Sequence, residues 1–404
     1  MITLENNAPL GAQFVDANDR SKARRLERPY PSLVVDARML FASGIGRYLR
    51  EIISRWPAPE EGTEAYVHNT PEQREWLKHA RPGSEFIATD ASIYSLGEQF
   101  LPAGLPSSAV YWVPHYNLPW RCPARLVATV HDAAPLVLKE AFPRVTQRLA
   151  AHFYFGIVRR KARRILAVSQ FTAHELVRHA GVRRDRIEVV ANGVSDDWLG
   201  ASTAHARDAQ RLLFVGNLKA HKNLGRLLDA IEIVRARTRR PVTLDVIGQA
   251  GGFRAGLEAR TEARLRTTPW IRLHGKVNDA QLREIYASAG ALVFPSLYEG
   301  FGLPMLEAMA AGCPVISSQA GALPEIGGDD HRDGGGVVYF DPRDPGRMAE
   351  RFEYFWRLPP AEHVRMADWG RRRAALFSWN LTARATQGVL REELARARAE
   401  ATAP

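Results

Sequence analysis

Short apolar segments alternate with segments of helical periodicity along most of the chain, and this alternation restricts the fold more than any other feature. Residues 32–40 are apolar enough for a buried strand, and after a glycine-containing turn residues 46–56 carry apolar side chains at helical spacing. Asn278 and Gln281 predict a capping box at the start of a later helix. Such alternation is typical of parallel sheets covered by helices on both faces, so we predict an α/β fold. It recurs in residues 125–133, 163–181, 186–194, 211–234, 242–252, 271–296, 313–321 and 335–342.

The length of the chain predicts two domains, because 404 residues can bury two ordinary hydrophobic cores. A polar stretch with turn-forming residues, 195–210, separates two series of strand signals. We therefore expect a flexible polar tail over residues 1–30, an N-terminal domain over residues 31–205 and a C-terminal domain over residues 206–376.

Composition excludes several classes of protein. Hydrophobic residues make up 46% and charged residues 25%, as in soluble globular proteins, and no apolar run is long enough to span a bilayer. The formal charge of +11 favours polyanionic partners such as nucleic acid, anionic lipid headgroups or phosphorylated ligands. The two cysteines, Cys122 and Cys313, indicate neither a disulfide framework nor a zinc site. No secretory signal is recognised, and the expected location is the reducing cytoplasm.

A glycine-rich turn joins a strand to a helix within residues 294–312. Gly300 and Gly302 allow the backbone to approach a ligand closely, and Pro304 suits the first turn of a helix. The free N–H groups at such a helix start favour phosphate, so we expect an anion site here.

Two carboxylates bracket this turn, Glu299 before it and Glu307 about one helical turn into the following helix. Each carboxylate can accept hydrogen bonds from the hydroxyl groups of a ribose or a hexose. The alternative is that Glu299 only ends a strand and Glu307 only complements the helix N-terminus, which is worth ~0.3–1 kcal/mol.

Further candidates lie at other strand ends, where open α/β sheets bind ligands. Gly216 follows one strand and Lys222 lies near the next helix, where its ammonium group can meet a diphosphate or simply be solvated. Gly44 and Gly46 lie between a strand and a helix, and His131 follows a strand. Neither G-x-G-x-x-G nor the P-loop pattern is complete, so neither a dinucleotide oxidoreductase nor a P-loop NTPase is supported.

Several of these segments together resemble the retaining glycosyltransferases of family 4. Residues 294–318, FPSLYEGFGLPMLEAMAAGCPVISS, are similar to the donor-site segment of that family, with its two glutamates separated by seven residues. Residues 214–230, FVGNLKAHKNLGRLLDA, resemble its glycine turn and lysine. VATVHDAAPL resembles its histidine-containing strand end, SGIGRYL its N-terminal glycine loop, and ILAVSQFTAHEL and VVANGV its inter-domain region. The similarity covers residues 32–390 in the family's order.

The resemblance implies a GT-B fold, in which two Rossmann-like domains face each other across a cleft and the C-terminal domain binds most of the nucleotide sugar. It implies that Glu307 binds the ribose hydroxyls, Glu299 a sugar hydroxyl and Lys222 the diphosphate. It also implies that residues 377–404 form a helix that crosses back to the N-terminal domain.

The resemblance assigns further contacts to the backbone. Phe301, Gly302 and Leu303, beside Gly300, would offer N–H groups to phosphate or sugar. The glycine loop, with Gly44 and Gly46, would approach the diphosphate from the other domain, and His131 would lie near the transferred sugar.

This chain departs from the family at the second phosphate-binding cation. Many members carry an arginine close to the lysine, whereas this chain has Asn217 and His221. Lys219, or His221 if it is protonated, can replace that arginine. No divalent metal and no other cofactor is expected.

The implied activity is retaining transfer of a hexose from a nucleotide-diphosphate sugar to a glycan or a polyprenyl-diphosphate-linked acceptor in surface polysaccharide synthesis. Similarity to O-antigen and exopolysaccharide mannosyltransferases favours GDP-mannose, with a UDP-sugar as the alternative donor. Residues 139–165 mix aromatic, apolar and basic residues, which fits either peripheral contact with an anionic membrane or an ordinary core-facing helix.

Two other functions stay open. A sugar-nucleotide epimerase or hydrolase on the same scaffold would bind the same donor. A basic nucleic-acid-binding protein would explain the charge, but no nucleic-acid motif is recognised and the basic residues are dispersed, so no nucleic-acid partner is expected.

Overall fold

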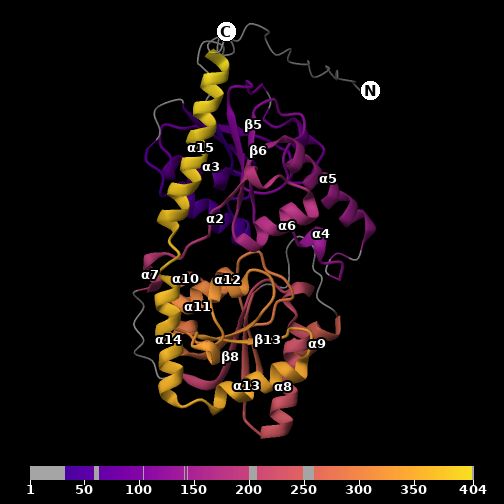
Figure 1. Cartoon of the computed structure of the whole chain (residues 1–404), viewed down its shortest axis with the longest axis vertical. Coiled ribbons are helices and arrows are strands. Elements are labelled where there is room, and N and C mark those ends of the chain that lie inside the picture. The colour runs from indigo at the N-terminus through magenta and orange to yellow at the C-terminus, as the bar shows by residue number, and fades with distance from the viewer. Residues whose placement is uncertain are drawn as a thin grey trace, which may run out of the picture.

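The computed structural model describes residues 32–402, except 59–62, 103, 141, 143, 200–206 and 249–258. The predicted polar tail, residues 1–30, lies outside the described residues. Two lobes follow each other along the long axis of the molecule, and each is built around one parallel sheet (Figure 1). The predicted α/β class is therefore confirmed.

The N-terminal sheet has seven strands in the order β3, β2, β1, β4, β5, β6, β7, and every neighbouring pair is parallel. Strands in this order wind outwards in both directions from β1 and β4, as in dinucleotide-binding folds. The strands are β1 (Leu33–Asp36), β2 (Glu64–His68), β3 (Glu85–Ala88), β4 (Val110–Val113), β5 (Arg125–Val130), β6 (Ala162–Ala167) and β7 (Ile187–Val189).

The C-terminal sheet has six strands in the order β10, β9, β8, β11, β12, β13, again all parallel. Numbered within the domain, this is the Rossmann order 3-2-1-4-5-6. The strands are β8 (Asp208–Val215), β9 (Thr243–Ile247), β10 (Ile271–Gly275), β11 (Ala289–Phe294), β12 (Val315–Ser318) and β13 (Val337–Phe340).

Helices cover both faces of each sheet. Those of the first lobe and the connection are α2 (Ser43–Ile53), α3 (Pro71–Ala80), α4 (Ala134–Val137), α5 (Val145–Lys161), α6 (Gln170–Ala180) and α7 (Asp196–Leu199). Those that follow are α8 (Leu224–Thr238), α9 (Ala259–Thr267), α10 (Asp279–Ser288), α11 (Leu303–Ala310), α12 (Leu323–Gly327), α13 (Pro345–Arg357), α14 (Pro360–Ala374) and α15 (Trp379–Thr402).

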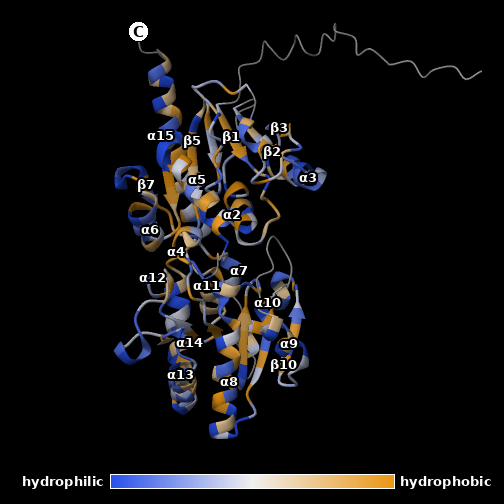
Figure 2. Cartoon of the chain, turned by 90° about the vertical axis from the view of Figure 1, so that its right-hand side faces the viewer, coloured by the Kyte–Doolittle hydropathy of each residue, from blue (hydrophilic) through white to orange (hydrophobic). Residues whose placement is uncertain are grey.

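The central strands supply the cores. Every residue of β4, β5 and β11 is buried, because helices pack on both faces of the sheets. Figure 2 shows strands of mostly hydrophobic residues inside each lobe and many hydrophilic residues on the outer helices.

The helix α15 joins the two lobes. It begins beside the C-terminal lobe and runs along the N-terminal one (Figure 1). The Trp56 Nε1 donates to the Ala383 carbonyl (3.3 Å), and Arg125 of β5 pairs with Glu393 (2.9 Å). Only glycine fits at position 193, because a Cβ there would lie 2.1 Å from the Trp379 backbone nitrogen. The two segments that connect the lobes, one at Gly193 and the other at Trp379, therefore lie against each other.

The starts of two helices, α2 and α10, can be compared with the sequence expectations. The first strand ends at Asp36, and α2 begins at Ser43, so Gly44 and Gly46 lie in the first turn of that helix rather than in a loop before it. The reason is a turn over residues 37–42, closed by backbone hydrogen bonds. The predicted capping box at the start of α10 is confirmed.

Candidate functional site

The carboxyl ends of the two sheets meet, and the loops after them are in contact. Asn217, after β8, donates to the Ser43 hydroxyl at the start of α2 (3.4 Å). The Gly300 carbonyl, after β11, accepts a hydrogen bond from the Ser169 hydroxyl of the N-terminal lobe (2.7 Å). Glu325 accepts from two backbone N–H groups at the start of α6 (2.8 and 3.0 Å). These contacts bring the glycine turns of both lobes to one place.

The turn before α11 has the conformation that its sequence predicts. Gly302 is the N-cap of α11 with a φ of +110°, and Pro304 lies in the first helical turn. At Gly300 a Cβ would lie 1.8 Å from the His131 carbonyl oxygen. This glycine is therefore required by the contact between the lobes.

Phe301 is buried, and Leu303 is partly buried. The Phe301 ring is buried edge-on against Phe377 (6.0 Å between centroids), so only its backbone can face a ligand. Leu303 contacts core residues of both lobes.

Glu299 and Lys222 form an ion pair between the two glycine turns of the C-terminal lobe. The Lys222 Nζ lies 2.5 Å from Glu299 Oε1, which also accepts from the Ser296 hydroxyl (2.5 Å). Burial alone would raise the pKa of Glu299, but Lys222 and these hydrogen bonds hold it below its ordinary value. Glu299 is therefore ionised at neutral pH.

Glu307 lies in α11 and pairs with a cation of the other lobe. Arg47 Nη1, from α2, lies 2.5 Å from Glu307 Oε1. Burial raises the pKa of Glu307 to about 7, against the effect of Arg47, and Asp279 adds to the rise. Glu307 thus titrates near neutral pH.

His131 is partly buried, and its imidazole is neutral. Burial lowers its pKa to about 4, and its ring lies edge-on to Tyr48 (5.0 Å between centroids). Its Nε2 lies 3.0 Å from the Pro114 carbonyl oxygen, which can only accept. Nε2 therefore carries the proton, and Nδ1 is an acceptor.

The segment from Gly216 to Lys222 lines the same region. A Cβ at Gly216 would lie 3.9 Å from Lys222 Cε, an ordinary contact, so it is the φ of +156° that favours glycine at this position. Burial and the charge of Lys222 lower the pKa of His221 to about 4, so His221 is neutral. Lys219 and Lys222 are the cations of this turn, and His221 is not a third.

The two glycines in the first turn of α2 have different surroundings. A Cβ at Gly46 would lie 2.5 Å from the Leu40 carbonyl oxygen, so Gly46 is needed for packing of α2. A Cβ at Gly44 would meet nothing within 4 Å. Gly44 therefore faces open space. It follows Ser43, whose hydroxyl accepts from Asn217.

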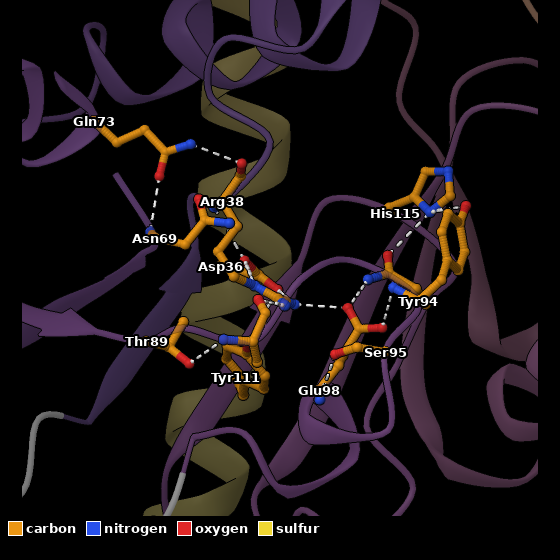
Figure 3. Close-up of polar contacts among 12 residues, drawn as sticks. Asp36, Arg38, Asn69, Gln73, Thr89, Tyr94, Ser95, Glu98, Tyr111 and His115 are labelled. Carbon is orange, nitrogen blue, oxygen red and sulfur yellow. Dashed lines mark hydrogen bonds and ion pairs between the residues drawn. The ribbon is translucent and has the colours of Figure 1, made fainter. Parts of the chain in front are cut away.

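A buried charged network between the end of β1 and the short helix Gly97–Phe100 was not found from the sequence. Figure 3 shows Arg38 between Asp36 (2.6 Å) and Glu98 (2.7 Å), and Glu98 also accepts from the Tyr94 backbone N–H (2.8 Å). Burial raises the pKa of Glu98, although Arg38 opposes this. Tyr94 adopts a φ of +64°. Because its charges are paired, the network anchors the segment that carries Tyr94.

Arg47, like the network around Arg38, was not identified as a candidate from the sequence. Its only sequence signal is its position directly after Gly46. Among the described residues, no group of three or more His, Cys, Asp or Glu side chains could hold a metal ion, and no helix is long and apolar enough to cross a membrane.

Comparison with known proteins agrees with this geometry. Residues 209–357 match the model of the glycosyl transferases group 1 family, and residues 105–198 match that of glycosyltransferase family 4. The chain is 33% identical over 229 residues to O-antigen chain mannosyltransferase B of Escherichia coli, covering 54% of this chain and 59% of that protein. It is 31% identical over 285 residues to the MMP α-(1→4)-mannosyltransferase of Mycolicibacterium hassiacum, covering 67% of this chain and 66% of that protein. The matches thus span about three fifths to two thirds of these relatives.

The fold also matches solved structures. Anabaena HepE in complex with UDP and glucose superposes with a TM-score of 0.65 at 16% identity, covering 89% of this chain and 99% of that one. The predicted GT-B fold is therefore confirmed. Because family models match parts of both lobes, the chain belongs to the glycosyltransferases of family 4, with a glycosyl transferases group 1 domain in its C-terminal lobe.

Proposed function

We propose that this protein is a retaining hexosyltransferase that uses a nucleotide-diphosphate sugar in the synthesis of a surface polysaccharide. The observation that carries the proposal is the gathering of two carboxylates, Glu299 and Glu307, and the cation Lys222 where the carboxyl ends of both sheets meet. Carboxylates accept from sugar hydroxyls, while an ammonium group and a helix N-terminus bind phosphate. A nucleotide sugar has both kinds of group.

The reaction requires stabilisation of the leaving diphosphate. As the bond to the anomeric carbon breaks, negative charge grows on the phosphate oxygen, and preorganised donors aimed at that charge are usually the largest catalytic contribution. Lys222 and the N–H groups at the start of α11 supply such donors. His131, being neutral, contributes an acceptor at Nδ1 for a sugar hydroxyl without adding charge.

Retention follows from attack on the same face from which the diphosphate leaves. Glu299 is assigned to a sugar hydroxyl and Glu307 to the ribose, so neither carboxylate is left to act as a nucleophile. The departing phosphate oxygen therefore takes the proton of the acceptor hydroxyl.

The donor sugar is proposed from the relatives. Two of them are named as mannosyltransferases, which favours mannose and hence GDP-mannose, whereas HepE was solved with UDP and glucose. The acceptor is a glycan or a polyprenyl-diphosphate-linked glycan. A thermal-shift panel of nucleotide sugars, with GDP-mannose and UDP-glucose as its first members, tests the donor.

Product analysis separates transfer from the competing reactions. With donor and a lipid-linked glycan, we expect elongated glycan and nucleoside diphosphate, and little turnover without acceptor. Release of free sugar, or a new sugar nucleotide, regardless of acceptor would instead identify a hydrolase or an epimerase. Binding of RNA or DNA that weakens steeply with salt would favour the nucleic-acid alternative.

We further propose that α5 contacts an anionic membrane. Val145, Leu149 and Phe153, four residues apart and thus on one face of the helix, are 59%, 63% and 51% exposed, while Phe155 and Val158 face the core. Exposed apolar side chains beside basic ones fit the surface of an anionic bilayer.

Basic residues continue from the end of this helix. A cavity of about 280 Å³ is lined by the cations Arg160, Lys161, Arg163 and Arg186. Their charge is complementary to lipid phosphate groups.

Liposome flotation tests this contact. Leu149→Gln with Phe153→Gln should reduce binding to vesicles that contain phosphatidylglycerol, whereas Val364→Gln, at an equally exposed position of α14, should not. Flotation that is equal for both variants would favour an ordinary surface helix.

A further inference from the structure

Arg47 bridges the two lobes at the proposed donor site. It lies in the N-terminal lobe, in α2, yet its guanidinium group lies 2.5 Å from Glu307 of α11 and 3.6 Å from Asp279 of α10. Its Cζ also lies 5.3 Å from the centre of the Trp198 ring. The Arg47 side chain is only 17% exposed. It is therefore a mostly buried cation with a carboxylate of the opposite lobe as its main partner.

This partner is the carboxylate that the proposed function assigns to the ribose. When ribose hydroxyls donate to Glu307, they compete with Arg47 for the same oxygens. A buried cation that loses its partner is strongly destabilised, so Arg47 needs a new acceptor in the bound state. Asp279 is a weak substitute, because its side chain is 67% exposed and its oxygen is 3.6 Å away.

The diphosphate of a bound donor can be this new acceptor for Arg47. Ser43 lies four residues before Arg47, hence on the same face of α2, and it contacts Asn217 in the turn that leads to Lys222. A diphosphate bound by Lys222 therefore lies next to the face of α2 that carries Arg47. A guanidinium group binds phosphate oxygens with two parallel hydrogen bonds.

We propose, on the basis of the proposed function, that Arg47 exchanges partners when the donor binds: it leaves Glu307 to the ribose and binds the diphosphate from the N-terminal lobe. Arg47 thereby supplies a second cation for the leaving group, beside Lys222. As the bond between the anomeric carbon and the phosphate oxygen breaks, its electron pair stays on that oxygen, where both cations stabilise it. The acceptor oxygen forms the new bond, and its proton passes to the phosphate.

The exchange also links donor binding to the arrangement of the lobes. Lys222 and Glu307 belong to the C-terminal lobe and Arg47 to the other, so the diphosphate is fully bound only while the lobes are together.

Binding of donor fragments to Arg47→Gln tests the proposal. Calorimetry would compare a nucleoside, its diphosphate and the sugar nucleotide in the wild type, in Arg47→Gln and in Arg47→Lys. Arg55→Gln is the control, because Arg55 lies just after the C-terminus of the same helix and pairs with Glu51 instead of Glu307. We expect Arg47→Gln to weaken diphosphate and sugar-nucleotide binding at least tenfold, while nucleoside binding is unchanged or tighter because Glu307 has been released.

Other results would overturn the proposal. If all three ligands bind Arg47→Gln more tightly by the same factor, Arg47 only competes for Glu307 and never contacts phosphate. If diphosphate affinity is unchanged, Arg47 has no role in donor binding. Should Arg47→Gln not fold, Arg47→Lys keeps the charge but not the paired hydrogen bonds, and it must still lose more affinity for the diphosphate than for the nucleoside.

The outcome also separates this inference from the proposed function. If the wild type and Arg55→Gln bind no nucleoside diphosphate and no sugar nucleotide, the proposed function fails. If both bind and only the response of Arg47→Gln differs from expectation, the role of Arg47 alone is wrong.

Discussion

Donor affinity should rise with pH through neutrality, because Glu307 must be ionised to accept two ribose hydroxyls. Burial raises the pKa of this carboxyl to about 7 in the ligand-free protein. The charged and titratable groups around it are Arg47, Asp279, Glu51 and Tyr286. His131 and His221, with pKa values of about 4, stay neutral over the range concerned.

The size of the effect follows from the pKa. A carboxyl group with a pKa of about 7 is ionised in roughly 10% of molecules at pH 6 and roughly 90% at pH 8. If only the ionised form binds the ribose, affinity rises about tenfold over this interval, or about 1.4 kcal/mol.

Calorimetric titration with a sugar nucleotide at constant ionic strength measures the change. A sugar nucleotide is the right ligand, since a terminal phosphate would itself titrate near pH ~6. In Glu307→Gln we expect weaker binding and no pH dependence over the same range. Equal affinity of the wild type at both pH values would refute the assignment of the ribose to Glu307, and a persistent slope in Glu307→Gln would assign the titration to another group.

Further predictions concern stability, the leaving group and the glycines. The pKa of Glu307 in the folded protein lies above its ordinary value of 4.5, so its contribution to stability is fully present below pH 4.5 and is lost as pH rises through about 7. Ligand-free wild type should therefore lose more thermal stability from pH 6 to pH 8 than Glu307→Gln. Scanning calorimetry measures the difference. Lys222→Ala should lower the transfer rate at least tenfold, which is about 1.4 kcal/mol of activation free energy, and should retain the unfolding midpoint. Lys78→Ala, which breaks an exposed ion pair of α3, should leave the rate unchanged. Unchanged turnover in Lys222→Ala would contradict its role. Gly300→Ala places a Cβ 1.8 Å from the His131 carbonyl oxygen and should separate the lobes, which an increased radius of gyration in solution scattering would reveal; wild-type dimensions and turnover would argue against this. Gly44→Ala has room in the ligand-free protein, so it should weaken donor binding without loss of stability if backbone and diphosphate meet there, and wild-type affinity would remove Gly44 from the site.

Much of the fold could be predicted because local patterns determine it. Buried strands such as β5 and β11 are short apolar runs bounded by turn formers, and the capping box at Asn278 depends on residues three positions apart. The strands β2 and β3 were not identified from the sequence, because one is only partly apolar and the other is only half-buried at the edge of the sheet. Their place is fixed by pairing, of β2 with β1 and of β3 with β2, rather than by their own residues.

The candidate site was predictable only in part, for the same reason. The two glycine turns are local motifs, so Glu299, Glu307 and Lys222 could be selected from the sequence. Their partners could not, because Lys222 pairs with a residue 77 positions away and Arg47 with one 260 positions away. Gly300 was read as a ligand contact, yet the structure shows that the approach of the two lobes requires it.

The two ion pairs of the site are built in the same way. In the ligand-free protein each carboxylate proposed for sugar hydroxyls is held by a cation proposed for phosphate, Glu299 by Lys222 and Glu307 by Arg47. A complete donor can replace both pairs at once, because its hydroxyls donate to the carboxylates while its phosphates accept from the cations. A fragment with only one kind of group leaves buried charges without partners, which is unfavourable. The wild type should therefore bind a nucleoside far more weakly than the diphosphate, and the difference should shrink when Arg47 and Lys222 are both replaced by glutamine. A difference of equal size in that double variant would mean that the cations do not exchange partners on binding.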